Sequence, residues 1–295
     1  MAAGADTQIE PSETTTAFAV DVGKRAASKR WKATAYSLLG AATLLLVWQL
    51  ASMYSATEFD LLPSPAAVAT QMWYFVVGNP EEGIAAGTVF VAFWETFRQT
   101  LFGFAAALAL GVPIGILMGR YRYAKNFFFD LVYLAANVPL IVYAILSLML
   151  FGLGDAGPAF VVTLLVLPVI ALNVAAGVEG VDRNLLAMSR AYHRPASAAV
   201  WHIVVPSFAP FLFAASRGSF AASWKLAALA ETFGGTVGVG VQIRKAFQGF
   251  SVTDMMAWMM FFVIFVVLIE RVVLMRFERY VFRYRLKRGE DVLRY

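Results

Sequence analysis

Cysteine is absent from this chain of 295 residues, and only two of its residues are histidines. The absence of cysteine excludes disulfides, thiolate metal sites and a cysteine nucleophile. Charged residues are also scarce at 15% of the chain, whereas a soluble domain has about 25%. No HExxH, GxSxG or P-loop motif occurs. We therefore expect no metal site, no catalysis and no ATP binding of the P-loop kind in this chain.

Apolar residues are what the chain has in abundance, at 60% of the sequence with a mean hydropathy of +0.68. They form runs of about 20 residues, the length that a helix needs to cross about 30 Å of hydrocarbon. The sequence therefore predicts an all-α polytopic membrane protein with six transmembrane helices. The predicted spans are 35–54, 100–118, 128–151, 159–178, 207–233 and 255–273.

The distribution of charge predicts the orientation of these spans. A polar tail, residues 1–34, ends in a basic cluster, and a second basic tail covers 276–295. Residues 56–95 carry acids but no Lys or Arg, which places them outside and both tails in the cytoplasm. The net charge of +5 is then explained by membrane orientation, and no nucleic-acid partner is expected. The transmembrane domain is predicted to span residues 35–275.

The fifth span contains three charged residues, Arg217, Lys225 and Glu231. A charge near the bilayer centre costs about 3 kcal/mol, so each should face protein or water. In one interpretation they pair or hold helices together, and Arg217 reaches the cytoplasmic interface. In the other, Lys225 and the adjacent Trp224 line a pathway for a small anion. The glycine-rich run 234–240 that follows is interpreted as a flexible outer loop.

The third span is interrupted at Asn137–Pro139, where a proline follows a polar residue. Tyr133 and Asn137 are four residues apart and therefore share a helix face. The Asn137 amide needs a hydrogen-bond partner within the membrane. It either joins two helices or lines the pathway, and Tyr143 is a further pathway candidate.

A charge-bearing stretch separates the fourth and fifth spans and is predicted to lie in the cytoplasm. This 181–206 loop reads VDRNLLAMSRAYHRPASAAVWHIVVP. Asp182 can cap a helix through about Tyr192, and Pro195 can open a second one to about Val204. Both helices would be amphipathic, so the loop either contacts a soluble partner or lies passively on the bilayer.

This loop resembles the cytoplasmic signature of permease subunits of ATP-binding-cassette importers. That signature is Glu-Ala-Ala, three residues, Gly, nine residues, Ile, one residue, Leu-Pro. Anchoring on Ile203 and Pro206 places residues 187–189 at Glu-Ala-Ala, His193 at the Gly and Val205 at the Leu. The spacing is therefore kept, but the Glu and the Gly are missing, which leaves the bend between the two helices open.

Four other segments are similar to the nitrate/sulfonate/taurine branch of these permeases: LLPSP, FGLGDAGP, VDRNLL and SRGSFAASWKLAALAE. The resemblance covers roughly residues 35–285. It implies a type I, MetI-like permease fold and a dimer, most simply of identical subunits, on two ATPase subunits. ATP and Mg would be bound by those ATPases. A periplasmic or lipid-anchored binding protein would deliver the substrate.

The resemblance also implies that the loop couples the chain to its ATPase. The coupling residues would be Ala187, Met188, Ser189, Arg190, His193, Arg194, Pro195, Ala196, Ser197, Trp201, His202 and Pro206. The function expected is import of nitrate, taurine or another organic sulfonate across a bacterial inner membrane. Two alternatives stay open: a permease of this class for an aromatic acid or an uncharged heterocycle, and a stand-alone secondary transporter with inverted repeats.

Overall fold

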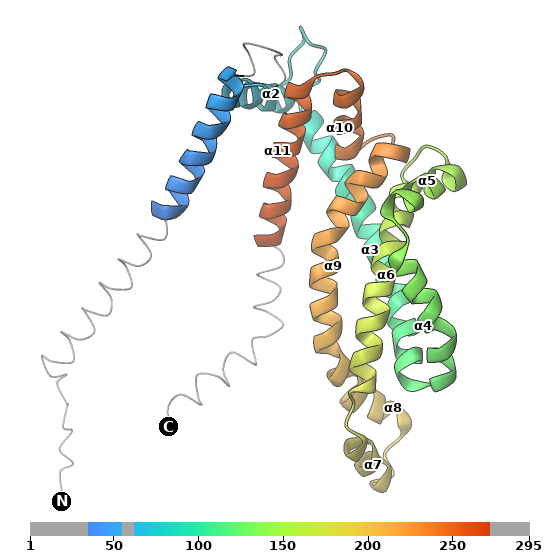
Figure 1. The fold of residues 1–295 in the computed structure, drawn as a ribbon. Helices are drawn as coiled ribbons and strands as arrows, with labels where there is room; N and C mark the ends of the chain where they lie inside the picture. Colours follow the sequence, from blue (N-terminus) through green and yellow to red (C-terminus); the bar gives the residue numbers. More distant parts are fainter. Residues whose placement is uncertain (1–34, 55–61, 272–295) are drawn as a thin grey trace, which may run out of the picture. The chain divides into compact units, whose positions relative to one another are not determined.

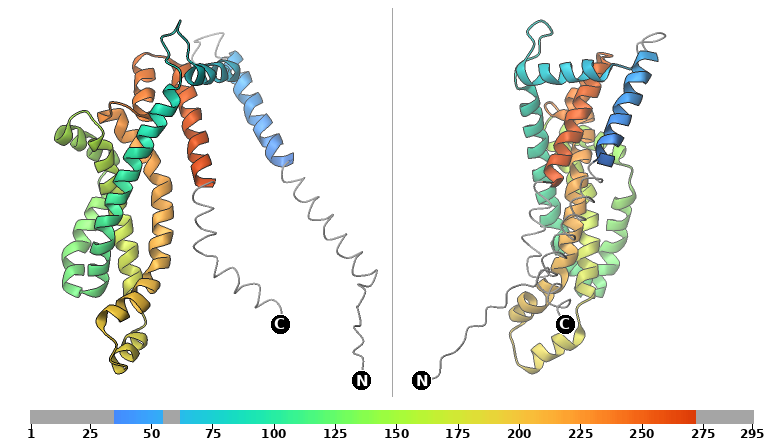
Figure 2. Two further views of the ribbon diagram at one scale, coloured as in Figure 1. Left: turned by 180° about the vertical axis from the view of Figure 1, so that it is seen from behind. Right: turned by 90° about the vertical axis from the view of Figure 1, so that its left-hand side faces the viewer.

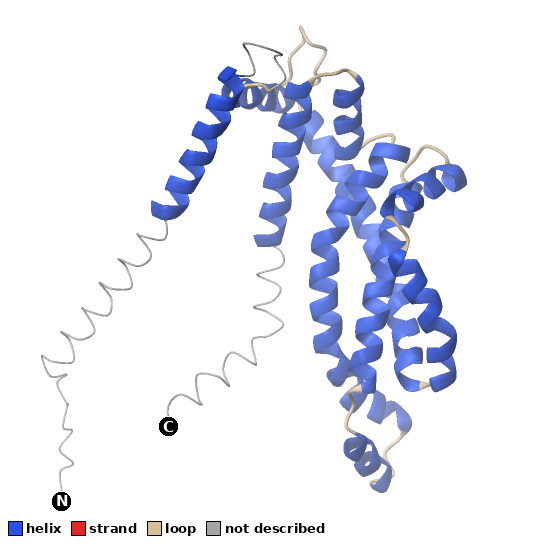
Figure 3. Ribbon diagram, in the orientation of Figure 1, coloured by secondary structure: helices blue, strands red, loops and turns tan. Residues whose placement is uncertain are grey.

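The computed structural model describes residues 35–54 and 62–271, so the predicted tails 1–34 and 276–295 lie outside the described residues. Within the described ranges, helices are joined by short loops, and the only β pairing is an isolated bridge between Asn79 and Ile84 (Figure 3). This architecture confirms the all-α prediction.

The chain divides after Ala67 into two compact units. The first contains the helix Ala35–Tyr54, which matches the first predicted span. Two side chains of this helix hold the LLPSP turn: the Trp48 indole donates to the Pro63 carbonyl at 3.1 Å, and the Ser52 hydroxyl donates to the Leu62 carbonyl at 2.9 Å. The turn is thus tied to the helix by its backbone carbonyls.

Helix α2, Pro65–Val77, begins at a proline, which is favourable in the first turn of a helix. The Ser64 hydroxyl accepts a hydrogen bond from the Ala67 amide at 3.2 Å, as expected of a capping serine. In the second unit, the later part of α2 packs on α11, Val252–Ile269, through rings of Phe75 and Trp258 whose centroids are 4.8 Å apart.

Three long helices form the centre of the second unit: α3 (Thr88–Arg120), α6 (Ala156–Glu179) and α9 (Val205–Gly234). They stay side by side in the different views (Figures 1 and 2). The sequence prediction for α3 began at Thr100, whereas the helix begins at Thr88. Its 33 residues extend over about 50 Å, so α3 is much longer than the hydrocarbon is thick.

Small residues line the face of α3 that packs against α6. They recur at every fourth position: Gly103, Ala107, Gly111, Gly115 and Gly119. A Cβ atom added at Gly103 would lie 2.5 Å from the Ala159 carbonyl oxygen, and one at Gly115 would lie 2.6 Å from that of Ala171. Only glycine therefore permits this backbone-to-backbone approach, which is a common way for membrane helices to associate.

The third predicted span is broken as expected. Helices α4 (Arg122–Asn137) and α5 (Leu140–Phe151) meet at an angle of 97°. Pro139 has no N–H to continue the helix, and it precedes the first residue of α5. Counting this pair as one span, the described residues contain six candidate membrane spans; without it, they contain five.

The connections at the two ends of the second unit differ (Figure 1). At one end lie α7 (Arg183–Ala191), α8 (Ala196–Ala199) and a π-helix, Val200–Val204. At the other end lies α10, Val239–Gln248, which the sequence analysis did not predict. We name these the α7 end and the α10 end.

The glycine-rich run 234–240 is packed rather than flexible, which corrects the expectation from sequence. Gly238 has φ 142°, a conformation that L residues rarely adopt. A Cβ atom at Gly240 would lie 1.9 Å from the Ala228 carbonyl oxygen. These glycines let the chain turn sharply out of α9 and lay the start of α10 directly against it.

Candidate functional site

The 181–206 loop begins with the predicted short helix, but its second predicted helix continues into α9 instead of ending near Val204. The Asp182 carboxylate accepts from the Asn184 amide at 2.8 Å and so caps α7. Pro195 directly precedes α8, and α8 continues through the π-helix into α9. The second half of the loop is therefore the beginning of one helix that runs from Ala196 to Gly234.

His193 makes the bend between the two helices. Its φ is 49°, in the left-handed region where glycine is favoured. Its amide donates to the Arg190 carbonyl at 2.9 Å, and the Arg194 amide donates to the Ser189 carbonyl at 3.1 Å. The chain thus adopts a glycine-type conformation with a histidine, at the position where the importer signature has glycine.

A groove of about 610 Å³ lies between α7 and the helix that follows it. Apolar side chains form much of its wall, and Arg194 and His202 supply its basic groups. The lining residues are Leu185, Met188, Ser189, Tyr192, Arg194, Ala198, His202 and Ile203. The loop therefore has a concave surface that is both apolar and cationic.

The structure gathers all twelve predicted coupling residues at the α7 end (Figure 1). Eleven of them are exposed, and the exception is Ser189, which is buried. The Trp201 side chain is 69% exposed although it is large and apolar. The Trp201 ring is therefore accessible at the α7 end.

Trp224 and Lys225 lie on different sides of α9. Trp224 is 1% exposed, and its ring packs against those of Phe97, Phe220 and Phe265 at centroid distances of 5.5, 5.9 and 5.3 Å. Lys225 is exposed. The hypothesis that the two line one pathway together therefore loses Trp224, because this ring belongs to the interior of the subunit.

An exposed face of α9 carries small and basic residues. We call it the α9 stripe: Ala214, Arg217, Gly218, Ala222 and Lys225. Gly218 and Lys225 are seven residues apart, close to two full turns, so they lie above one another. A Cβ atom at Gly218 would meet no other atom within 4 Å. Among the described residues, nothing therefore covers the stripe at Gly218.

Lys225 forms no ion pair among the described residues. A lysine facing lipid at this depth would cost about 3 kcal/mol. The α9 stripe therefore faces either a second protein surface or a water-filled space rather than lipid.

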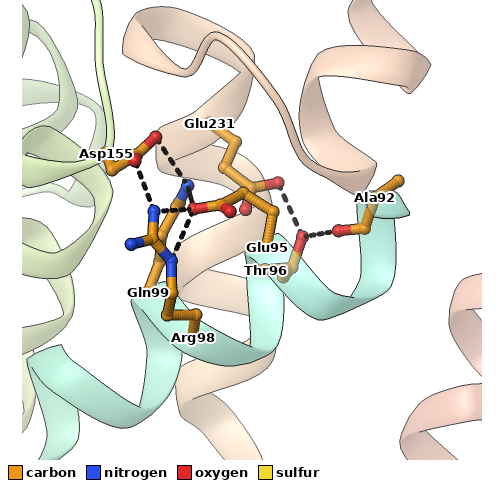
Figure 4. A network of polar contacts seen from close by, with 7 residues as sticks. All are labelled: Ala92, Glu95, Thr96, Arg98, Gln99, Asp155 and Glu231. Atoms are coloured by element: carbon orange, nitrogen blue, oxygen red, sulfur yellow. Dashed lines mark hydrogen bonds and ion pairs between the residues drawn. The ribbon is translucent and has the colours of Figure 1, made fainter. Parts of the chain in front are cut away.

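Glu231 is a structural residue in this fold. Its side chain is fully buried, and its Oε2 accepts from the Thr96 hydroxyl at 3.0 Å and from the Gly240 amide at 2.8 Å. The Thr96 hydroxyl in turn accepts from the Val239 amide at 3.0 Å. Glu231 thus joins α9 to α3 and α10 (Figure 4) and does not pair with Arg217 or Lys225.

A neighbouring ion-pair network was missed by the sequence analysis. Arg98 contacts the carboxylates of Glu95 at 2.6 Å and Asp155 at 2.5 Å, and Gln99 donates to Glu95 at 3.2 Å (Figure 4). The spacing of Glu95, Arg98 and Gln99 by three and four residues is the signal that marks them as neighbours on one helix. It was overlooked because the predicted span began at Thr100.

The Arg244 side chain forms hydrogen bonds with the end of α9. Its guanidinium donates to the carbonyl oxygens of Thr232 at 3.2 Å, Phe233 at 3.4 Å and Gly235 at 3.1 Å. The last carbonyls of a helix have no partner within the helix, so a basic group is stabilising there. This role explains why an arginine lies beside the last residues of α9.

The three candidates of the broken span separate into two environments. Tyr133 and Asn137 are both exposed, and the Asn137 amide donates to the Tyr133 carbonyl at 2.7 Å. Tyr143 is buried, and its hydroxyl donates to the Ala135 carbonyl across the break at 2.9 Å. Tyr143 therefore stabilises the break between α4 and α5.

In the described part of the chain, no three His, Asp or Glu residues are grouped to hold a metal ion.

The fold and the site define a multi-pass membrane transport protein. It has long apolar helices around the α3–α6–α9 centre, a basic loop at one end and a basic stripe on a spanning helix. The family described as "Binding-protein-dependent transport system inner membrane component" matches residues 111–285, more than half of the chain. The chain belongs to this family. Membership implies an ATPase and a substrate-binding protein as partners.

Individual relatives agree with the predicted branch. The taurine transport system permease protein TauC of Escherichia coli is 22% identical, with 72% of this chain and 76% of the relative covered. The nitrate import permease protein NrtB of Synechocystis sp. is 24% identical, with 78% and 83% covered. A putative aliphatic sulfonates permease protein, SsuC of Escherichia coli, is 25% identical, with 72% and 77% covered. These relatives confirm the resemblance to the nitrate/sulfonate/taurine branch.

Solved structures confirm the fold. A chain of the MetNI methionine ABC transporter, solved in inward-facing conformations, superposes with a TM-score of 0.52 at 21% identity, covering 61% of this chain and 89% of that chain. A second crystal form gives a TM-score of 0.51 at 20% identity, covering 60% and 88%. The predicted MetI-like permease fold is therefore correct.

Proposed function

We propose that this chain is the permease subunit of an ATP-driven importer for a small anion such as nitrate, taurine or another organic sulfonate. It works in a bacterial inner membrane as one half of a permease dimer, most simply of identical subunits. The observation that carries the substrate class is Lys225, an exposed base on the spanning helix α9. A fixed positive charge at this depth stabilises an anion and disfavours a cation.

The surroundings of Lys225 support a pathway. Gly218 and Ala222 leave free volume beside it on the α9 stripe, and Arg217 adds a second basic group on the same helix. The relatives named for taurine, nitrate and aliphatic sulfonates handle small molecules that carry an anionic oxygen group. Tyr133 and Asn137 are retained as further candidates because both are exposed on α4.

In the same proposal, the 181–206 loop docks on the ATPase in the cytoplasm. The helix that begins at Ala196 carries both Trp201 and Lys225. The 24 residues between them correspond to about 36 Å along the axis. A displacement of the loop when the ATPases close on ATP would therefore move α9 directly and change access to Lys225.

The same proposal includes the orientation of the chain in the membrane. With the α7 end inside, both termini are cytoplasmic and the α10 end faces the periplasm. A periplasmic or lipid-anchored binding protein would then deliver the anion to the α10 end, where the Arg98 ion pairs lie. ATP and Mg are bound by the two ATPase subunits and not by this chain.

Uptake by the complete complex in proteoliposomes tests the substrate proposal. We expect Lys225→Ala to reduce uptake of labelled nitrate or taurine by about tenfold or more, the loss that corresponds to 1.4 kcal/mol. Lys225→Arg should keep part of the activity. Arg122→Ala is the matched control, because Arg122 is an exposed base on α4, away from the stripe.

Two results would contradict the proposal. Full anion uptake by Lys225→Ala, with the ATPase still co-purifying, would remove Lys225 from the pathway. Uptake by the chain alone, driven by an ion gradient without ATP, would favour a secondary transporter.

A further inference from the structure

We propose that the groove of the 181–206 loop receives an acidic segment of the ATPase, so that the permease supplies the basic side of this contact. The inference rests on the proposed function, because it takes the loop as the docking site. It adds the chemistry of the partner surface. An importer signature that keeps its glutamate would place an acid here, whereas this chain has alanine at that position, Ala187.

The charges of the loop carry the argument. Between Arg183 and Ala230 the chain has no Asp or Glu. Asp182, just before this stretch, is engaged as the cap of α7. Arg190 and Arg194 are exposed. Since the loop itself provides no acid beyond Asp182, the complementary charge must come from the surface that docks on it.

The shape of the loop selects a protein segment as the occupant. The groove of about 610 Å³ is comparable to ligand sites of about 300–1,000 Å³, so it can take several side chains. Leu185, Met188 and Tyr192 on its α7 side are apolar and exposed, and Arg194 and His202 add basic groups. An occupant that satisfies both features is an apolar side chain flanked by Asp or Glu.

The chain contains one other candidate occupant. The first 23 residues include four acids and no base, Asp6, Glu10, Glu13 and Asp21. In the proposed topology this segment is also cytoplasmic. We favour the ATPase because family membership implies such a partner, and the experiment separates the two occupants.

Because the chain has no cysteine, a single introduced cysteine can be labelled without background. Met188→Cys would carry a maleimide-linked photo-crosslinker within the purified complex, followed by identification of the captured peptide by mass spectrometry. We expect an ATPase peptide that contains Asp or Glu. The control is Phe250→Cys, an exposed position at the α10 end, which should capture no ATPase.

Reversing the charge of Arg194 provides a second test of the inference. Arg194→Glu should lower the amount of co-purified ATPase by about tenfold, and Arg194→Gln should lower it less. Replacing the captured acid of the ATPase by Lys should restore binding to Arg194→Glu. Arg122→Glu, the same charge change at an exposed position on α4, should leave the ATPase bound.

Each result decides one point. Four results would overturn the acidic-segment inference, even if the ATPase still co-purifies. They are a captured ATPase peptide without acids, unchanged ATPase binding by Arg194→Glu, capture of the chain's own residues 1–23, and capture of lipid alone. If no ATPase co-purifies with the unaltered chain, the proposed function itself fails.

Discussion

The α10 end and the α7 end of the second unit use charged residues in opposite ways. At the α10 end, Glu231, Arg98 and Arg244 all have partners within the subunit. At the α7 end, Arg194 and His202 are exposed in a loop that has no acid beyond the capping Asp182. These three groups at the α10 end therefore serve the fold, whereas Arg194 and His202 at the α7 end are available to a partner.

Each end places one residue other than glycine in the left-handed region. At the α10 end this residue is Phe250, with φ 54°, and Gly238 has φ 142°. At the α7 end it is His193, with φ 49°. The two ends therefore do not differ in this respect, and the use of the His193 imidazole has to be tested by substitution.

The largest effect should come from Glu231→Ala. The substitution leaves the buried Gly240 amide without an acceptor, and the Thr96 hydroxyl keeps only the Ala92 carbonyl. An orphaned amide costs about 1–3 kcal/mol and a lost hydrogen bond about 1 kcal/mol, so we expect the free energy of unfolding to fall by about 3 kcal/mol. Thermal unfolding of the detergent-purified chain measures this loss. Glu231→Gln keeps an acceptor oxygen and should lose less. An unchanged midpoint for Glu231→Ala would show that the α10 end does not depend on this side chain.

An intermediate effect should separate the two ends directly. Arg244→Ala removes three hydrogen bonds to the end of α9 and should lower the free energy of unfolding by about 1–2 kcal/mol. Arg194→Ala, the matched change at the α7 end, should alter it by no more than about 0.5 kcal/mol. The same unfolding measurement compares them. Equal losses from both variants would mean that the ends do not differ.

The smallest effect should be a gain in loop stability, from the substitution His193→Gly. His193→Gly relieves the left-handed backbone and should raise the stability of the loop by up to about 1 kcal/mol. Local protection of residues 183–199 in hydrogen exchange would report it. Co-purification of the ATPase should fall at the same time. His193→Ala keeps the strain and removes the ring, so it should show the second effect without the first. If neither variant changes ATPase binding, the imidazole does not contribute to the contact.

Local signals in the sequence predicted much of the fold. The Asp182 cap and the break at Pro139 were both predicted, because each depends on residues close in the chain. The bend at His193 could not be derived in this way. The motif has Gly at this position, and only the structure shows that a histidine keeps the same conformation.

Contacts between distant segments could not be predicted. Glu231 was recognised as a charge that needs a partner, but its partners Thr96 and Gly240 come from other helices. Trp224 and Lys225 are neighbours in the chain, yet about 100° apart around the helix, so the sequence could not tell which of them packs inward. Helix α10 was missed because its starting glycines are typical of loops as well as of close helix packing.

The small residues on the face of α3 that packs against α6 restrict how these two helices can move. They repeat every four positions, about 6 Å along the axis, and each glycine faces backbone or Val and Ile atoms of α6. Sliding α3 by less than one repeat would drive larger side chains into those atoms. The two helices therefore keep a fixed register along their axes and move as one rigid body. Any change between inward- and outward-facing shapes must be hinged elsewhere in the subunit.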